Sequence, residues 1–400
     1  MAAAGDWPGY CFGIGRGTGQ PREHFRVLQW MLDVGVARAI VAALITWLVL
    51  KLLHPLAPRL NLLDYPKGRK DHAHPTPITG GLAMLVAFIA LGALTVGELA
   101  SRTVVSFAAA ALLVSAVGLA DDRHDLRWYW RILAQVAAAL IMIYGADVRV
   151  EQIGPVFGLD SLALGWLSVP FTVFATVGII NAVNMIDGAD GLAGLLVAVC
   201  LVMLAGAAVY AGNMGLSRHS LVVAGAVGAF LLYNMRFPWQ PRAKAFMGNA
   251  GSAFLGLVVA WVVFRLTQNP GHPVNPVLAL WLIPIPIIDC LVLTVRRTRQ
   301  GRSPFSAGRD HVHHFMQNAG FGPTQAAVAL ACFSLACGVL AGKAMRLDIP
   351  HPVILLAFLL LTVGWYWLSA RRERAVGFFR AVRRLPVFGP VSDSAKRGQP

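Results

Sequence analysis

The sequence predicts an all-α protein that crosses a membrane about eleven times. Three observations predict this: 57% of the 400 residues are apolar, only 13% are charged, and the mean hydropathy is +0.63. A soluble chain of this length would form two or three domains with polar surfaces, which this composition does not favour. A helix that spans the hydrocarbon core of about 30 Å needs roughly 20 mostly apolar residues.

Eleven stretches of the chain are candidates for such helices. They are residues 32–53, 79–99, 103–120, 132–146, 163–181, 194–212, 219–233, 250–268, 277–294, 324–342 and 352–370. We expect residues 31–370 to form the membrane domain and 371–400 a basic cytoplasmic tail. Residues 1–30 lack the apolar core of a signal peptide, so we expect a disordered extension, with Met31 as the natural start.

The placement of positive charge predicts the orientation. Most of the 34 Lys and Arg residues fall in alternate loops, at 51–77, 121–131, 234–248, 295–323 and 371–400. The positive-inside rule assigns these loops to the cytoplasm, the N-terminus to the outside and the C-terminus to the inside, in a bacterial inner membrane. The net charge of +15 therefore reflects the membrane and excludes nucleic acid as the partner. The tail sequence RRERAVGFFRAVRRLP predicts an amphipathic helix on anionic lipid headgroups.

Polar residues gather in loops on this same predicted face. The loops cover residues 62–81, 118–131, 181–194, 233–252 and 296–322. A transporter would instead place polar groups near the bilayer midplane, in broken helices. The distribution therefore predicts a catalytic site at the cytoplasmic surface of the membrane.

Three carboxylates end the third apolar stretch, in the sequence DDRHDL. Asp121 and Asp125 would share one helix face, with Asp122 beside them. Carboxylates this close repel one another unless a cation or a proton lies between them, so they indicate a divalent metal, a bound phosphate with its counter-cation, or a general base. The alternative is a solvated helix end, with Arg123 and Arg127 as ion-pair partners.

A polar stripe ends the fifth stretch, in the sequence NAVNMIDGADGL. Asn181, Asn184 and Asp187 recur every three residues, and Asp190 follows between two glycines. A stripe of this kind cannot face lipid. Amide and carboxylate oxygens suit Mg²⁺ better than zinc. The alternative is structural packing of the amides.

A histidine cluster follows the ninth stretch. His311, His313 and His314 lie close to Arg309, without the thiolates or Glu of familiar zinc sites. Further positive charge precedes them, at Arg296, Arg297, Arg299 and Arg302. Such a loop suits an anionic diphosphate, and a solvated basic loop is the alternative. With no Walker-type phosphate cradle in the sequence, the three clusters together predict phosphoryl transfer at a membrane surface.

These motifs resemble the polyprenyl-phosphate N-acetylhexosamine-1-phosphate transferases, most closely the bacterial undecaprenyl-phosphate GlcNAc-1-phosphate branch. DDRHDL matches the family's DDxxDL, NAVNMIDGADGL its NxxNxxDGxDGL, FMGNAGS its FMGDAGS, and SPFSAGRDHVHHF its HIHH-type loop. The resemblance covers about residues 32–375. It implies transfer from UDP-GlcNAc to undecaprenyl phosphate with Mg²⁺ or Mn²⁺, which gives undecaprenyl-diphosphate-GlcNAc and UMP and begins the synthesis of O-antigen or a related surface polysaccharide.

The resemblance also implies roles for individual residues. The lipid phosphate would be bound or deprotonated by Asp121 and Asp122, and neutralised or contacted by Arg69, Lys70 and Asp125. The nucleotide would be held by Asn181, Asp187, Asp190 and Asn234, with Phe246 stacked on uracil. The metal would be ligated by Asn184 and position 249. The diphosphate and sugar would be held by Arg309, His311, His313 and His314.

Position 249 departs from the family pattern, since FMGNAGS has Asn249 where the motif has Asp. Asn lacks the negative charge that normally dominates affinity for a hard cation, so we expect weak metal binding and reduced or absent turnover.

A different UDP-N-acetylhexosamine donor is the alternative within the same class. Both a single displacement and a covalent phospho-intermediate remain open, and we favour the single displacement. Small residues in several stretches allow a homodimer without specifying one.

Overall fold

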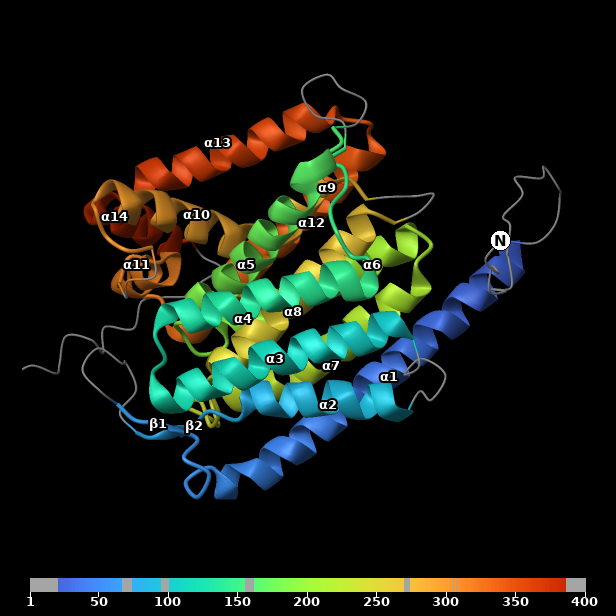
Figure 1. Ribbon diagram of the computed structural model, residues 1–400. Coiled ribbons are helices and arrows are strands. Elements are labelled where there is room, and N and C mark those ends of the chain that lie inside the picture. The colour runs from blue at the N-terminus through green and yellow to red at the C-terminus, as the bar shows by residue number, and fades with distance from the viewer. Residues whose placement is uncertain are drawn as a thin grey trace, which may run out of the picture.

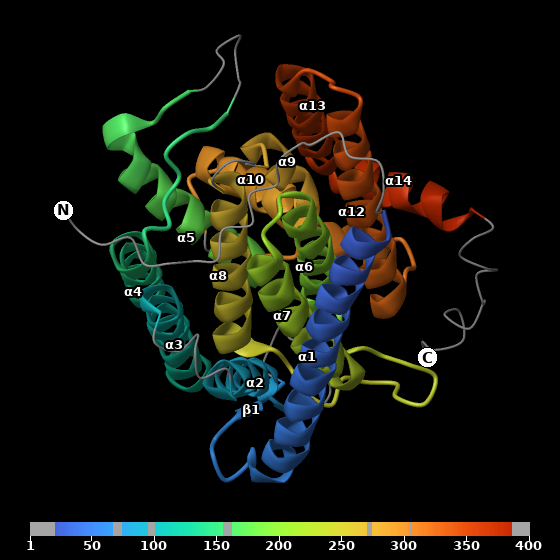
Figure 2. The same ribbon diagram turned by 90° about the vertical axis from the view of Figure 1, so that its right-hand side faces the viewer.

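The protein is a bundle of long helices arranged around one central helix, α8 (Gly248–Thr267) (Figures 1 and 2). The computed structural model describes residues 21–66, 74–94, 101–154, 162–269, 274–304, 306 and 308–385, of which 21–34 and 92–94 are described by their backbone alone. Nine helices in these ranges are long and apolar enough to cross a membrane. The predicted all-α membrane fold is confirmed.

The remaining elements follow one another along the chain. They are α1 (Pro21–Leu56), β1 (Leu63–Asp64), β2 (Thr76–Pro77), α2 (Gly80–Leu94), α3 (Arg102–His124), α4 (Trp128–Leu140), the π-helical turn η1 (Ile141–Gly145), the 3-10 turn η2 (Gly165–Leu167), α5 (Ser168–Ile186), α6 (Leu192–Tyr210), α7 (Met214–Asn234), α9 (Pro276–Leu282), α10 (Pro284–Arg299), α11 (Val312–Asn318), α12 (Pro323–Arg346), α13 (His351–Ser369) and α14 (Arg372–Arg383).

Burial separates the core of the bundle from its lipid-facing surface. Nearly all of α8 is buried, in contact with α2, α3, α5 and α6, whereas α1 and α13 lie at the periphery. Large apolar side chains on the outer helices point away from the protein, for example Leu44, Phe174 and Leu360 at 59%, 75% and 62% exposure. Such side chains would be costly in water and are favourable in lipid.

Two of the eleven predicted spans differ in the structure. Stretch 277–294 is broken into α9 and α10, which meet at Ile283 with a bend of 93°. Pro284 and Pro286 open α10, and proline has no N–H to continue a preceding helix.

In stretch 79–99, the apolar part of α2 within the described residues is Gly80–Leu91, shorter than the other spans. Of the predicted N-terminal extension, residues 21–30 belong to α1 and residues 1–20 lie outside the described residues.

The first loop is joined to the start of α8 by backbone hydrogen bonds. The short antiparallel ladder pairs Leu63 with Pro77 and Asp64 with Thr76. Beyond it, the amide of Phe246 donates to the carbonyl of Pro77, and the amides of Gly80 and Gly81 donate to the carbonyls of Phe246 and Met247. These bonds satisfy the open N-terminus of α2 and bring the first loop to the FMGNAGS segment.

Close packing of α3 against α8 depends on Gly118. A Cβ atom at Gly118 would lie 2.6 Å from Cα of Ala250, so the backbones touch with no room for a side chain. This contact lies one turn before Asp121 and Asp122. It therefore sets how the carboxylates of α3 meet the first turn of α8.

We expect Gly118→Ala to destabilise the protein by about 1–3 kcal/mol, because an added methyl group must push two backbones apart. Thermal unfolding of the purified protein in detergent measures this. Gly178→Ala in α5 is the matched control, since nothing lies within 4 Å of a Cβ at that position and Ala favours the helix. Equal melting temperatures for the two variants would contradict the role given to Gly118.

Candidate active site

Most of the predicted site residues meet at one end of the bundle. The ends of α3, α5 and α7, the start of α8 and the segment before α11 surround an open cleft of about 1200 Å³. The predicted residues that line it are Asp121, Asp122, Asp125, Asn184, Asp187, Asp190, Asn234, Phe246, Asn249, Arg309 and His314. Arg69 and Lys70 lie outside the described residues. β1 and the end of α3, which both contribute residues to the lining, lie close together in Figure 1.

The two adjacent carboxylates of α3 are held by the first turn of α8. The backbone amides of Asn249 and Ala250 donate to the two oxygens of Asp122, at 2.9 and 3.3 Å. Asp121 accepts from the side-chain amide of Asn249 at 2.8 Å and pairs with Arg131 at 3.2 Å. A helix N-terminus favours a carboxylate, because its amides lack partners within the helix. The Gly-rich segment is therefore a binding site for the carboxylates of α3.

Gly248 makes this contact possible. Its φ of +72° lies in the left-handed region, and a Cβ there would lie 2.6 Å from Oδ2 of Asp122. Only glycine fits that position without strain.

Asn249 uses both ends of its side chain. Its Nδ2 donates to Asp121, while its Oδ1 accepts from Nδ2 of Asn184 at 2.8 Å. The same nitrogen of Asn184 also donates to Oγ of Ser252. A carboxylate at position 249 would instead lie directly against Asp121. The amide thus joins α3, α5 and α8 without placing a third negative charge beside Asp121 and Asp122.

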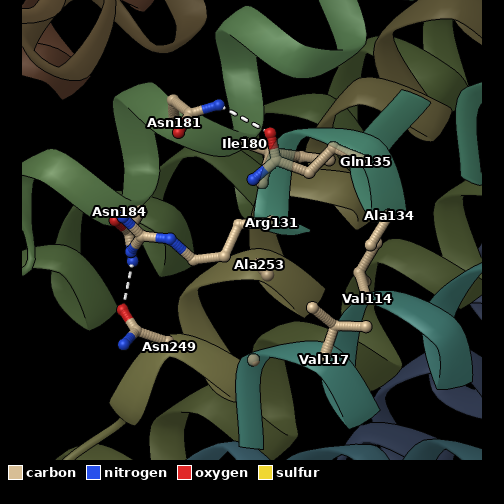
Figure 3. A pocket seen from close by; sticks show the side chains of 11 residues that line it. Val114, Val117, Arg131, Ala134, Gln135, Ile180, Asn181, Asn184, Asn249 and Ala253 are labelled. Carbon is tan, nitrogen blue, oxygen red and sulfur yellow. Dashed lines mark hydrogen bonds between the residues drawn. The ribbon is translucent and has the colours of Figure 1, made fainter. Parts of the chain in front are cut away.

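A second, smaller cavity of about 20 Å³ lies behind the cleft, between α3, α4, α5 and α8 (Figure 3). Asn184, Asn249 and Arg131 line it, together with Gln135 and Asn181. Asn181 donates to Oε1 of Gln135 and to the carbonyl of Val177. The sequence predicted that Asn181 holds the nucleotide, but the structure places it at this inner cavity and not among the residues that line the cleft.

The loop after α5 presents two carboxylates to the cleft. Asp190 pairs with Arg236 at 2.6 Å. Burial, and then the nearby charges of Asp122 and Asp190, raise the pKa of Asp187 to about 7. Asn234 fixes this loop from behind: its Oδ1 accepts from the amide of Gly191, and its Nδ2 donates to the carbonyl of Ala245.

The histidine segment divides between the cleft and the interior. Arg309 and His314 line the cleft, whereas His311 and His313 are buried, at 8% and 0% exposure, and do not line it. Burial, and then the neighbouring His314 and His311, lower the pKa of His313 well below its ordinary value. The family resemblance implied that His311, His313 and His314 hold the diphosphate and sugar, and of the three only His314 is among the residues that line the cleft.

The arginines of α10 are also not placed for phosphate binding. Arg297 is 2% exposed and binds Asp310 at 2.7 Å and the carbonyl of Pro304 at 2.8 Å. Arg296 donates to Ser369 and Arg299 to Tyr366. None of these three, nor Arg302, is among the residues that line the cleft. Their contacts instead attach the histidine segment and α13 to α10.

Sequence reasoning missed three residues of the site. Asp64 of β1 and Arg236 line the cleft, and Arg131 pairs with Asp121. Arg236 had a signal, because it lies two residues after Asn234 in a segment that runs into FMGNAGS. Asp64 and Arg131 also lie in two of the polar loops, 62–81 and 118–131, but only the folded chain shows that they approach the other carboxylates.

The charge of the cleft fits a divalent cation. Its carboxylates are Asp64, Asp121, Asp122, Asp125, Asp187 and Asp190, and its arginines are Arg123, Arg236 and Arg309. Among the described residues of the lining, the carboxylates outnumber the arginines, and the neighbouring amide oxygens are hard donors of the kind that Mg²⁺ prefers. Within the part of the chain that the structure describes, no three His, Cys, Asp or Glu side chains form a metal site by themselves. Mg²⁺ commonly binds in this way, through one or two carboxylates plus substrate phosphates and water.

Comparison with known proteins agrees with the geometry. The model of glycosyl transferase family 4 matches residues 104–267, which run from α3 to α8. A Haemophilus influenzae protein is 36% identical over 294 residues, 74% of this chain and 82% of its own. Proteins of Pasteurella multocida and Escherichia coli K12 are 33% and 32% identical, over 86% and 85% of this chain and 96% and 92% of their own. All three are named undecaprenyl-phosphate alpha-N-acetylglucosaminyl 1-phosphate transferase.

The raised pKa of Asp187 predicts a pH dependence of stability. The unfolded carboxyl titrates near 3.8 and the folded one near 7, so the folded state binds the extra proton between these values. Without divalent cations, this contribution to the free energy of unfolding is present below about pH 4 and is lost as the pH rises to 7. Asp187→Asn has no such proton, so its melting temperature in EDTA should exceed that of the wild type by a margin that grows from pH 5 to pH 7. A margin independent of pH would contradict the burial of this carboxyl.

Proposed function

The chain belongs to glycosyl transferase family 4, alongside the undecaprenyl-phosphate N-acetylglucosaminyl 1-phosphate transferases, and from this membership we propose that it transfers GlcNAc-1-phosphate from UDP-GlcNAc to undecaprenyl phosphate. The products are undecaprenyl-diphosphate-GlcNAc and UMP. One observation of the structure carries the proposal. The carboxylates of α3, the amides of α8 and the loop after α5 meet in one cleft, at the end of a bundle of apolar helices.

The reaction is a displacement at phosphorus. An oxygen of the lipid phosphate forms a bond to the β-phosphorus of UDP-GlcNAc, the bond from this phosphorus to the bridging oxygen breaks, and UMP leaves with the electron pair. Both substrates are anions, and the cleft carries more carboxylates than arginines. A bound Mg²⁺ or Mn²⁺ would supply charge neutralisation in such a site. Asn184 and Asn249 would hold it, together with a carboxylate of the cleft.

The acceptor is assigned to the carboxylates of α3. Asp122 is fixed by two backbone amides and Asp121 by Arg131 and Asn249, so neither needs to reorganise when a phosphate arrives. They would orient the lipid phosphate or accept its proton. Asp187, with a pKa of about 7, adds a group that can exchange a proton near neutral pH. The lipid chain would lie along the apolar helices, with only its head in the cleft.

The donor is assigned to other residues that line the cleft. Arg309 and His314 would contact the diphosphate and sugar, and Phe246 would stack on the uracil ring. Asn234 has both ends of its amide engaged, so we assign it to holding the loop after α5 in place of the uridine contact implied by the family resemblance. The same applies to Asp190, which would act through its ion pair with Arg236.

The protein is a multi-pass bacterial membrane protein. We place it in the inner membrane with the cleft on the cytoplasmic face, because four of the five loops that are rich in Lys and Arg contribute residues to the lining of the cleft. The product would then begin O-antigen or a related surface polysaccharide. Transfer of a different N-acetylhexosamine phosphate is the second candidate, since few contacts at the sugar end of a cleft decide between such donors.

The proposal predicts transfer of radiolabel from UDP-GlcNAc to undecaprenyl phosphate by the detergent-purified protein with Mg²⁺. UDP-GalNAc and a 6-deoxy donor, assayed beside it, should give less product. Asp122→Asn should lower the rate roughly 100-fold or more, because it removes a fixed charge at the reacting phosphate. Asp147→Asn is the control: Asp147 follows η1, at the end of α4 away from the cleft, and its side chain is 87% exposed. Failure of every donor to give a lipid-linked product would overturn the proposal.

Asn249→Asp tests the metal site separately. The variant replaces the amide that donates to Asp121 with a carboxylate, so two like charges adjoin unless a cation lies between them. We expect a lower melting temperature than wild type in EDTA, a larger stabilisation by Mg²⁺, and a lower Mg²⁺ concentration for half-maximal transfer.

Asn275→Asp makes the same chemical change at the N-cap of α9, outside the cleft, where either residue can cap the helix. It should leave the response to Mg²⁺ unaltered. If Asn249→Asp also leaves the Mg²⁺ requirement and the rate unchanged, position 249 is not a metal ligand.

A further inference from the structure

A buried carboxylate lies directly behind the histidine segment. Asp289 of α10 is 3% exposed and accepts three hydrogen bonds: from Nδ1 of His311 at 2.8 Å, from the backbone amide of Val312 at 3.2 Å and from Nε1 of Trp365 at 3.3 Å. The donors come from the start of α11 and from α13. One side chain therefore holds three helices together beside the cleft.

Asp289 also caps α11 from another helix. The N-cap residue of α11 is His311, whose side chain makes no capping hydrogen bond. The ring is turned toward Asp289 instead, and the second oxygen of Asp289 accepts from Val312, the first residue of α11. Because a carboxylate oxygen accepts, the imidazole donates through Nδ1, which fixes both its orientation and its tautomer.

Contacts between the three histidine rings connect His311, which Asp289 holds, to His314 at the cleft. The rings of His311 and His313 stack at 5.6 Å with an angle of 20°, and those of His313 and His314 lie 4.1 Å apart. His313 is fully buried against the loop after α5, where a Cβ at Gly188 would lie 2.8 Å from its Nε2. His314, at the end of this row, lines the cleft.

We propose that Asp289 is a positioning residue for the donor substrate. Through His311 and α11 it holds His314 and Arg309 where they can contact the diphosphate of the donor. The inference rests on the proposed function, because the diphosphate is the donor's. Asp289 itself does not line the cleft and touches no substrate. Its carboxylate is needed because three buried donors would otherwise lose their acceptor.

The experiment compares Asp289→Asn with Cys290→Ser. Asn has the same shape as Asp, yet its amide cannot accept from His311 and Val312 at both of its ends. We expect the KM for UDP-GlcNAc to rise about tenfold or more, with the KM for undecaprenyl phosphate close to wild type. Cys290 is the next residue of α10, and its thiol contacts Met185 instead of α11. Its variant should leave both KM values unchanged.

Coupling tests whether Asp289 acts through His311. In a His311→Ala background, Asp289→Asn should add little further loss, because the bond between the two side chains is already absent. Full additivity of the two losses would overturn the proposal. Equal increases in both KM values, together with a lowered melting temperature, would also overturn it, since they indicate a general loss of structure.

Hydrogen exchange gives a readout that does not need activity. In Asp289→Asn, backbone amides of residues 308–318 should exchange faster than in the wild type, while those of the first turn of α8 should not change. Unchanged exchange in residues 308–318 would overturn the positioning role. Absence of transfer by the wild-type protein would overturn the proposed function alone, because the exchange result stands without it.

Discussion

The hydrogen bonds between the Asp122 carboxylate and the first turn of α8 are the interaction on which the site depends. They join the end of one membrane helix to the beginning of the most buried one. A carboxylate can be placed at this depth because two backbone amides without helical partners solvate it in place of water. Two glycines permit the approach: Gly118, where α3 touches α8, and Gly248, which adopts a left-handed conformation beside the carboxylate. The first loop, joined to the same turn by backbone bonds, completes this side of the cleft.

The amide at position 249 belongs to the same arrangement. With Asp at this position, as in the family motif, three carboxylates would meet between α3 and α8. With Asn249, one of them becomes a donor to Asp121 and an acceptor from Asn184. Asn249, which departs from the family pattern, therefore lacks the negative charge that would attract a cation. In return its side chain makes hydrogen bonds that join three helices. Stability and metal affinity are opposed at this one position.

The sequence predicted the helical fold well, because bilayer thickness sets the length of an apolar stretch whatever its neighbours are. It also predicted that the carboxylates of α3 and the amides of α5 and α8 meet at one end of the bundle, since the polar loops all fall on the same predicted face. The sequence did not predict which polar side chains are buried, because packing between distant segments determines their burial. Burial of His311 and His313 depends on Asp289, which lies within a stretch that reads as an ordinary span. Neither Asn181 at the inner cavity nor buried Arg297 differs, in sequence, from a residue that faces substrate.

The bond between Asn184 and Asn249 bears on the order in which ligands enter. Both amides already have partners in the structure, and Asp121 has two. A bare cation that enters must compete with these hydrogen bonds and shed part of its water shell. A cation that arrives already chelated by a nucleotide diphosphate brings most of its own ligands with it. Under the proposed function, the metal would therefore enter as part of the donor, and the nucleotide sugar, not the protein, would carry the ion to the membrane surface.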